Sequence, residues 1–329
     1  MRNLITDVPG LKVGHAEDAR LGSGATAVIF DEPAVASIDL RGGGPGTRET
    51  ALLDPAQTVQ GIDAIALAGG SAFGLDAASG VQAWLREQGR GFAVRTARVP
   101  IVPAAIMFDL LSGGDKDWGR FPPYRELGYA AAAGAAAEFS LGSVGAGTGA
   151  TTVNCKGGIG SASAQSPEGI LVGALAVVNA VGSVIVGRGP WFWAAPFEVG
   201  AEYGGLGLPD PFPPQALEPV TKGNVRESTT LVVVATDAIL TKAQANRLAV
   251  MAQSGLSRAI YPVHSPLDGD VLFAASTGRR PLADPVFALT ALGTLAANVV
   301  ARAIARGVFA ASALPLPGAM PSWRDQFGR

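Results

Sequence analysis

The chain has 329 residues, of which 25 are Lys or Arg and 27 are Asp or Glu, so its formal net charge is −2. A near-neutral chain offers no basic surface for phosphates, which argues against nucleic acid as a partner. Only 16 % of the residues are charged and 48 % are hydrophobic, so we expect much of the surface to be hidden in a thick core or between subunits. One cysteine and two histidines exclude a disulfide framework and a histidine-rich metal site.

No segment has the features of an export signal or a membrane span. The first fifteen residues, MRNLITDVPGLKVGH, contain no apolar run of signal-peptide length. The longest uncharged apolar stretch, residues 169–187, contains Asn179, Ser183 and several glycines, which makes it a poor membrane span. The sequence therefore predicts a soluble, cytoplasmic protein with no membrane partner.

The first half of the chain is typical of short strands followed by a helix. Residues 11–40 contain three β-type runs, and 62–68 (IDAIALA) predict a buried strand that leads into a turn. Apolar residues recur at helical spacing through 71–89. A strand, a proline-marked turn and an apolar segment are expected in 94–111, and 112–127 is loop-like.

The middle of the chain is richer in glycine and proline. An alanine-rich helix is predicted at 129–138, and 141–163 is a small, polar, glycine-dense segment. The paired apolar runs of 169–187 predict two strands joined by a turn at 182–183. Residues 190–228 are rich in proline, glycine and turn residues, which predicts a flexible linker.

The last third returns to regular elements. TTLVVVATDA at 229–238 predicts a buried strand, and Thr241 is a suitable N-cap for a helix over 243–255. A long apolar helix is expected at 284–307, with Pro285 at its first position. The whole pattern indicates a mixed α/β protein without a fixed repeat.

Two glycine-rich loops have the composition of phosphate cradles. GGGPGT at 42–47 and GAGTGA at 145–150 both lack a following Gly-Lys-Ser/Thr, so neither is a P-loop. GAGTGA also differs from GxGxxG, and no ribose-binding acid follows it about 20 residues later. Tight turns are the alternative interpretation of both loops.

The common hydrolase motifs are absent, since the chain contains neither GxSxG nor HExxH. A Ser-His-Asp triad would have to use His15 or His264, and a structural histidine is the alternative for both. Asp268 and Asp270, in LDGD, place two carboxylates close together, where like charges raise one pKa and bind ammonium or hydroxyl donors. A solvated turn is the other interpretation of this pair.

The junction at 226–234 (RESTTLVVV) joins the predicted linker to the apolar strand. Threonines are ordinary residues at the start of a strand. A Thr that became a new N-terminus would carry its own base, because an α-amine has a pKa near 7.7–8.0. Such a nucleophile needs no histidine, but the backbone must be cut immediately before it.

Five segments, in chain order, resemble the autoprocessing DmpA/NylC family of N-terminal-nucleophile hydrolases: 41–50 (RGGGPGTRET), 69–85 (GGSAFGLDAASGVQAWL), 156–163 (KGGIGSAS), 229–244 (TTLVVVATDAILTKAQ) and 262–270 (PVHSPLDGD). This family includes β-aminopeptidases and nylon-oligomer (6-aminohexanoate-oligomer) hydrolases. The similarity spans nearly the whole chain, from TDVPGLKVGH to the last long helix.

The resemblance implies a single catalytic domain, residues 1–329, with a four-layer αββα fold of the DmpA/ornithine acetyltransferase-like type. It implies one self-cleavage, between Ser228 and Thr229, into a large α chain (1–228) and a small β chain (229–329) of roughly 23 and 10 kDa. The two chains would stay together as one αβ unit, and these units would self-associate, often as tetramers. Ser228 departs from the Asn or Gly that usually precedes the cut in this family.

The resemblance also assigns roles by position. Thr229 would be the nucleophile, with its own α-amine as the base. Lys156 would lie beside it and keep the amine neutral or polarise the oxygen. Asn179 would donate its side-chain amide to the oxyanion, and Asp268 and Asp270 would orient the α-amine or bind a substrate ammonium. No metal or organic cofactor is implied.

The function implied is that of an N-terminal threonine amidohydrolase or aminopeptidase, which cleaves small peptides or aminohexanoate oligomers through an acyl-enzyme. With a Thr nucleophile, the chain is more similar to the nylon-oligomer hydrolases than to the β-aminopeptidases, which use a serine. Two alternatives remain open. One is an ornithine acetyltransferase-like acyltransferase, which passes the acyl group to an amine, and the other is a non-catalytic small-molecule binder built on the glycine loops.

Overall fold

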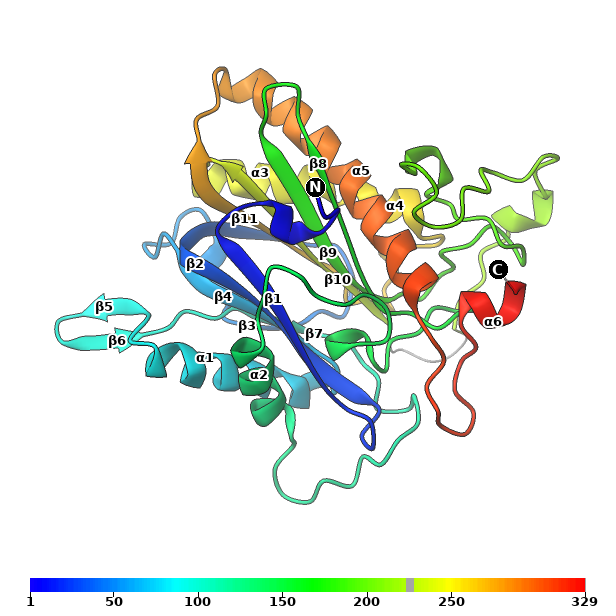
Figure 1. The fold of residues 1–329 in the computed structure, drawn as a ribbon, viewed down its shortest axis with the longest axis horizontal. Helices are drawn as coiled ribbons and strands as arrows, with labels where there is room; N and C mark the ends of the chain where they lie inside the picture. The colour runs from blue at the N-terminus through cyan, green and yellow to red at the C-terminus, as the bar shows by residue number, and fades with distance from the viewer. Residues whose placement is uncertain (223–227, 329) are drawn as a thin grey trace.

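The computed structural model describes residues 1–222 and 228–328 (Figure 1). Two β-sheet layers lie face to face, and helices cover the outer face of each. Apolar side chains of both sheets form the core between them, among them Phe30, Leu67, Leu175, Val233 and Phe273. Separate apolar clusters join each sheet to its helices. This arrangement confirms the predicted four-layer αββα fold.

The first layer is covered by two helices. It contains β1 (Leu11–Asp18), the first part of β2 (Ser23–Leu40), β4 (Ile62–Ala68), β7 (Ala104–Ile106) and β3 (Gly46–Arg48). Its outer face packs on α1 (Ala77–Glu87) and α2 (Tyr124–Ala133). β2 pairs with β1 and β4 through its first part and with β11 through residues 35–40. This one long strand therefore connects the two layers.

The second layer carries the C-terminal part of the chain. Its remaining strands are β11 (Val271–Arg280), β10 (Thr229–Ala238), β9 (Leu171–Asn179) and β8 (Ile159–Gln165), in that order from β2. The helices on its outer face are α3 (Lys242–Ala252), α4 (Ser254–Ala259) and α5 (Pro285–Ala310). Strand β10 runs parallel to β11 and antiparallel to β9.

The apolar run of β10 follows from burial on both of its faces. Leu231 and Val233 contact the core between the sheets, whereas Val232 and Val234 contact the core under the helices. Successive side chains of a strand point to opposite faces, so a strand covered on both sides needs apolar residues at every position. The predicted strand at 229–238 is thereby confirmed.

The remaining elements are small. β5 (Phe92–Val94) and β6 (Ala97–Val99) form a hairpin that projects from the body, and α6 (Trp323–Phe327) lies near the C-terminus (Figure 1). Residues 180–222 are irregular with two short 3₁₀ turns. The predicted N-cap Thr241 is confirmed, because its hydroxyl accepts the Gln244 N–H. In the described chain one helix, α5, is apolar and long enough to cross a membrane, but more than half of it is buried in the protein.

Two sequence predictions about elements were wrong. The helix expected at 129–138 occupies 124–133, because the alanine run is broken by Gly134, where the helix ends. The expected pair of strands with a turn at 182–183 does not form. β9 ends at Asn179 and pairs instead with β8, which arises from the glycine-dense segment that the apolar pattern did not identify.

Candidate active site

Strand pairing brings the predicted nucleophile beside two other predicted site residues. Thr229 begins β10 and lies opposite Asn179, the last residue of β9. Ser228, immediately before it, forms an isolated parallel bridge with Asp268. Thr229 is only 5 % exposed. The ends of the two strands and the loop before β11 therefore meet at one buried point of the sheet.

The carbonyl of Ser228 is held by two donors. The Thr229 hydroxyl donates to this oxygen at 2.6 Å, and the Gly269 N–H donates to it at 2.8 Å. A Cβ atom at Gly269 would lie 2.6 Å from Thr229 Oγ1, so a glycine is needed for this close approach. The Ser228–Thr229 peptide bond thus has a nucleophilic hydroxyl on one side and a backbone donor on its carbonyl oxygen.

The two carboxylates of LDGD are built into this loop. The Asp270 carboxylate accepts a hydrogen bond from the Thr230 N–H at 2.8 Å and lies 2.9 Å from His264 Nδ1, with which it forms a second hydrogen bond. Asp268 accepts the Val181 N–H at 3.3 Å and also bonds Ser265. Both carboxylates are 1 % exposed, which excludes the solvated-turn interpretation. Burial and then the charge of Asp270 raise the pKa of Asp268 to about 6.

A loop that resembled a phosphate cradle supports this acidic pair. The Gly44 N–H donates to the Asp268 carbonyl at 2.8 Å, and the Arg41 N–H donates to the Asp270 carbonyl at 3.2 Å. The GGGPGT segment therefore packs against the loop that carries the carboxylates. This is a tight structural turn, which was the alternative interpretation from the sequence.

Asn179 is fixed by three contacts. Its Oδ1 accepts the Thr151 N–H at 3.0 Å and the Lys222 Nζ at 3.2 Å, and its Nδ2 donates to the Phe108 carbonyl at 3.1 Å. A primary amide has two N–H donors. One of them is directed at Phe108, so an oxyanion would have to be bound by the other.

Lys156 is buried and surrounded by backbone carbonyls. Its Nζ donates to the carbonyls of Gly147, Ala150 and Gly157 at 3.0, 2.8 and 2.7 Å. Burial lowers its pKa to about 7, although the nearby charge of Asp109 acts in the opposite direction. Within the described residues no hydrogen bond joins Lys156 to the nucleophile. Two of its three acceptors come from the GAGTGA loop, whose carbonyls thus hold a cation of the same chain.

Sequence reasoning missed two charged groups beside the predicted residues. Asp109 is fully buried, accepts the Ser23 hydroxyl at 2.6 Å and the Gly70 N–H at 2.8 Å, and burial raises its pKa. The only sequence signal was a lone carboxylate in the apolar run IMFDLL. Lys222 donates to the carbonyl of Thr151 at 2.9 Å, besides its contact with Asn179. Nothing in the local sequence of Lys222 indicated that role.

Comparisons with known proteins identify the family of the chain. The family model described as Peptidase family S58 matches residues 3–319. An uncharacterized aminopeptidase of Mycobacterium tuberculosis (strain ATCC 25618 / H37Rv) is 43 % identical, over 99 % of this chain and 98 % of its own. A 6-aminohexanoate-oligomer endohydrolase of Kocuria sp. (strain KY2) is 29 % identical, over 90 % of this chain and 80 % of its own.

Two solved structures share the fold. A β-aminopeptidase of Burkholderia sp. superposes with a TM-score of 0.71 at 23 % identity, covering 99 % of this chain and 92 % of that one. The L-aminopeptidase D-Ala-esterase/amidase of Ochrobactrum anthropi, described as a variant of the Ntn-hydrolase fold, gives a TM-score of 0.73 at 21 % identity with the same coverage.

Proposed function

The chain belongs to peptidase family S58 and is a hydrolase of amide bonds, and from this premise we propose that Thr229 is its nucleophile, freed by self-cleavage of the Ser228–Thr229 bond. The observation that carries the proposal is the contact of the Thr229 hydroxyl with the Ser228 carbonyl, which also accepts the Gly269 N–H. Of the predicted linker before this bond, residues 223–227 lie outside the described residues.

Self-cleavage needs no external nucleophile in its first step. Thr229 Oγ1 attacks the Ser228 carbonyl carbon, and the Gly269 N–H stabilises the charge that develops on the carbonyl oxygen. The C–N bond then breaks, so that the acyl group moves from nitrogen to oxygen and the hydroxyl proton ends on the amine. Water hydrolyses the resulting ester, which leaves a carboxylate on Ser228 and a free α-amine on Thr229.

In turnover the Thr229 hydroxyl is again the nucleophile, and the newly freed α-amine is its base. The free α-amine of Thr229 takes the Oγ1 proton while Oγ1 attacks the substrate amide carbon. The N–H of Asn179 that is not bonded to Phe108 binds the oxyanion. The leaving amine takes the proton, and water hydrolyses the acyl-enzyme. The scheme uses no metal or organic cofactor.

The buried charges assist the free amine. A buried cation lowers the pKa of a nearby amine, so the ammonium form of Lys156 would favour a neutral Thr229 α-amine. Asp270 already accepts the neighbouring Thr230 N–H, and Asp268 lies across the bridge from Ser228. Both carboxylates would orient the new α-amine or a substrate ammonium.

Ser228 and Thr230 flank Thr229 and also carry hydroxyl groups, so they are the alternative nucleophiles at this junction. Ser228 Oγ and Thr230 Oγ1 are buried and have no hydrogen-bond partner within the described chain. Thr230 points to the opposite sheet face from Thr229, since the side chains of a strand alternate. The Thr229 hydroxyl contacts the carbonyl that precedes it, whereas the Thr230 hydroxyl contacts none within the described chain, which favours Thr229 as the residue after the cut.

The proposal extends to small peptides or amides as substrates, a cytoplasmic location, and association of αβ units, with a tetramer as the expected state. The low charge content and the exposed Phe287 at the start of α5, which is 77 % exposed, support self-association. Light scattering of the purified protein would measure the assembly directly, and a monomeric mass would contradict this part.

Denaturing electrophoresis tests the proposal. Wild type should give two bands of roughly 23 and 10 kDa and hydrolyse an aminoacyl p-nitroanilide. Thr229→Ala should give one full-length band and no turnover. Thr230→Ala is the matched control, since it removes a neighbouring buried hydroxyl and should still give two bands. A single full-length band from wild type would contradict self-cleavage.

A further inference from the structure

Residues 150–157 form a tight turn that carries one predicted site residue and supports another. The N–H of the last residue in this turn donates to the carbonyl of the first at 2.9 Å, and Thr151 pairs with Lys156 in an antiparallel bridge. Thr151 also donates its N–H to Asn179 Oδ1 at 3.0 Å. A displacement of the turn would therefore move Lys156 and disturb the orientation of Asn179 at the same time.

The C-terminal end of the chain is bonded to the tip of this turn. The Lys156 N–H donates to the Pro321 carbonyl at 2.8 Å. Gln326 Nε2 donates to the Asn154 carbonyl at 2.8 Å and lies 3.3 Å from Cys155 Sγ. Three successive residues of the turn thus contact the segment that contains α6.

Trp323, the first residue of α6, anchors this segment in the protein. Its side chain is 1 % exposed, and its ring is stacked on that of Phe192 with the centroids 5.7 Å apart. Its Nε1 donates to the Pro190 carbonyl at 3.0 Å. The rings of Phe309 and Phe327 lie 5.0 and 5.5 Å from the Trp323 ring. The segment is therefore fixed to the body of the protein and can hold the turn in place.

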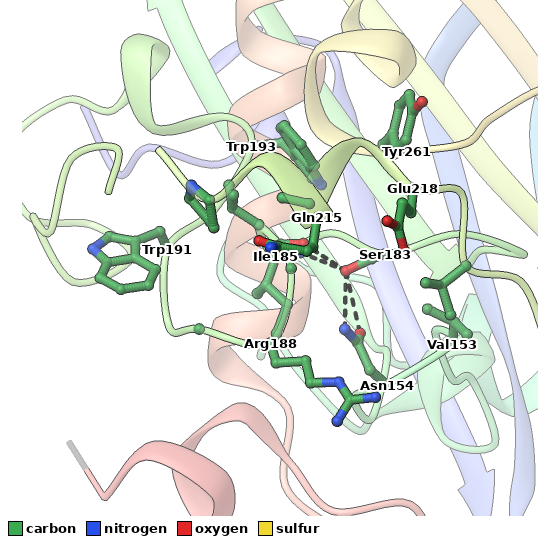
Figure 2. Close-up of a pocket in the computed structure, with 16 residues that line it drawn as sticks. Val153, Asn154, Ser183, Ile185, Arg188, Trp191, Trp193, Gln215, Glu218 and Tyr261 are labelled. Carbon is green, nitrogen blue, oxygen red and sulfur yellow. Dashed lines mark hydrogen bonds between the residues drawn. The ribbon is translucent and has the colours of Figure 1, made fainter. Parts of the chain in front are cut away.

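The same contacts extend to a groove of about 740 Å³ that opens beside the turn (Figure 2). Asn154 lines this groove, and its Nδ2 donates to Ser183 Oγ at 3.0 Å. Trp191 and Trp193 line it as well, and they alternate along the chain with the two residues that contact Trp323. The C-terminal segment therefore supports part of the groove lining as well as the turn.

We propose that residues 321–327, here called the C-terminal clamp, hold the 150–157 turn in the position that turnover requires, and that Trp323 and Gln326 are positioning residues of the enzyme. The inference rests on the proposed function and adds these two residues to it. After the proposed cut the clamp belongs to the small chain and the turn to the large chain. The contact is then one through which one chain orients site residues of the other.

The clamp acts on turnover and not on the cut. Self-cleavage uses the Thr229 hydroxyl and the Gly269 N–H, and within the described residues no hydrogen bond joins either group to the clamp. Turnover also uses Lys156 and Asn179, which the turn carries or supports. A loosened clamp should therefore leave self-cleavage intact and slow the hydrolysis of substrates.

Cys155 reports whether the clamp is closed, because it is the only cysteine of the chain. Its thiol is 1 % exposed and burial raises its pKa to about 11, so it should react slowly with Ellman's reagent at neutral pH. Trp323→Ala removes the anchor and should speed this reaction about tenfold or more. Trp84→Ala removes a partly buried indole on α1 and is the matched control, which should keep the wild-type rate. An unchanged rate in Trp323→Ala would overturn the proposal.

Hydrolysis of an aminoacyl p-nitroanilide tests the functional part. Trp323→Ala should lower kcat, referred to the folded protein, about tenfold with KM within about threefold, because a displaced turn misaligns Lys156 and Asn179. The variant and the Trp84→Ala control should both still give two bands. A wild-type kcat in Trp323→Ala, with Cys155 reacting faster, would overturn the proposal. Failure of wild type to cut itself would instead contradict the proposed function.

Gln326 allows a milder test, since its side chain is exposed and its exchange should not prevent folding. Gln326→Met removes the donor to the Asn154 carbonyl, and kcat should fall about threefold, as for one lost hydrogen bond. Gln326→Lys supplies a donor again and should recover most of this loss. Gln88→Met, at an exposed glutamine that ends α1, is the matched control and should keep the wild-type kcat. A lower melting temperature of Gln326→Met with an unchanged kcat would show a purely structural role and overturn the proposal.

Discussion

Thr230 lies next to the proposed nucleophile, and its buried hydroxyl lowers the stability of the fold. Its side chain is fully buried, and within the described chain Oγ1 has no hydrogen-bond partner. An unpaired buried hydroxyl costs about 1–3 kcal/mol, which an isosteric apolar side chain recovers in part. Thr230→Val should therefore raise the free energy of unfolding by about 1 kcal/mol and preserve the cut. Urea unfolding with intact-mass analysis checks both, and a loss of stability would contradict this account of Thr230.

Lys156 makes the stability of the protein depend on pH. Its pKa is about 7 in the fold, against about 10.4 in an unfolded chain. Between these values the unfolded chain binds more protons, so stability should rise with pH from about 7 to about 10, by at most about 1.4 kcal/mol per pH unit. Below about pH 7 the lysine is protonated in both states and its contribution should be constant.

Lys156→Met isolates this dependence. Both proteins are best compared in the Thr229→Ala background, where the chain stays uncut and unfolding refers to a single chain. The loss of three carbonyl contacts lowers the stability of the variant at every pH, so the informative quantity is the slope. Urea titrations at several pH values should show the rise in the Lys156 protein and a flatter profile in the variant. Parallel profiles would show that burial does not perturb this lysine.

At the scale of elements, helix α5 explains one glycine of the KGGIGSAS segment, Gly160. A Cβ atom at Gly160 in β8 would lie 1.8 Å from the Ala303 carbonyl of that helix. Gly160→Ala should force α5 away from the sheet and lower stability by about 1–3 kcal/mol or more. Gly44→Ala is the control, because its Cβ would meet one atom, at 3.8 Å, and it should stay within about 0.5 kcal/mol of its parent. Thermal unfolding in the Thr229→Ala background measures both, and equal effects would contradict the close packing.

The packing of β10 and β8 explains why the sequence predicted the first of these strands and not the second. β10 was predictable because both of its faces are buried, which requires an uninterrupted apolar run. β8 was not, because contact with α5 requires small residues such as Gly160, and small polar residues resemble a loop. Thr229, Asp268 and Asp270 could be proposed as site residues because their motifs are continuous in the chain. Asp109, Lys222 and the groove were missed, since only the tertiary fold brings their distant segments together.

At the scale of the whole molecule, the proposed cut divides a sheet whose strands remain paired. β10 and β11 would belong to the small chain, with β9 of the large chain on one side and β2 of the large chain on the other. Both chains also share the core between the sheets. The two fragments should therefore elute together as one species in native size-exclusion chromatography and separate only in denaturant. Separate elution in native buffer would contradict this shared sheet.

The most direct test of the central claim is intact-mass analysis of the purified wild-type protein, with N-terminal sequencing of each species. We predict two species, one whose mass corresponds to residues 1–228 and one to residues 229–329, the second beginning Thr-Thr-Leu-Val. A single species with the mass of the full chain, in a preparation that still hydrolyses amides, would contradict the claim that Thr229 acts from a new N-terminus.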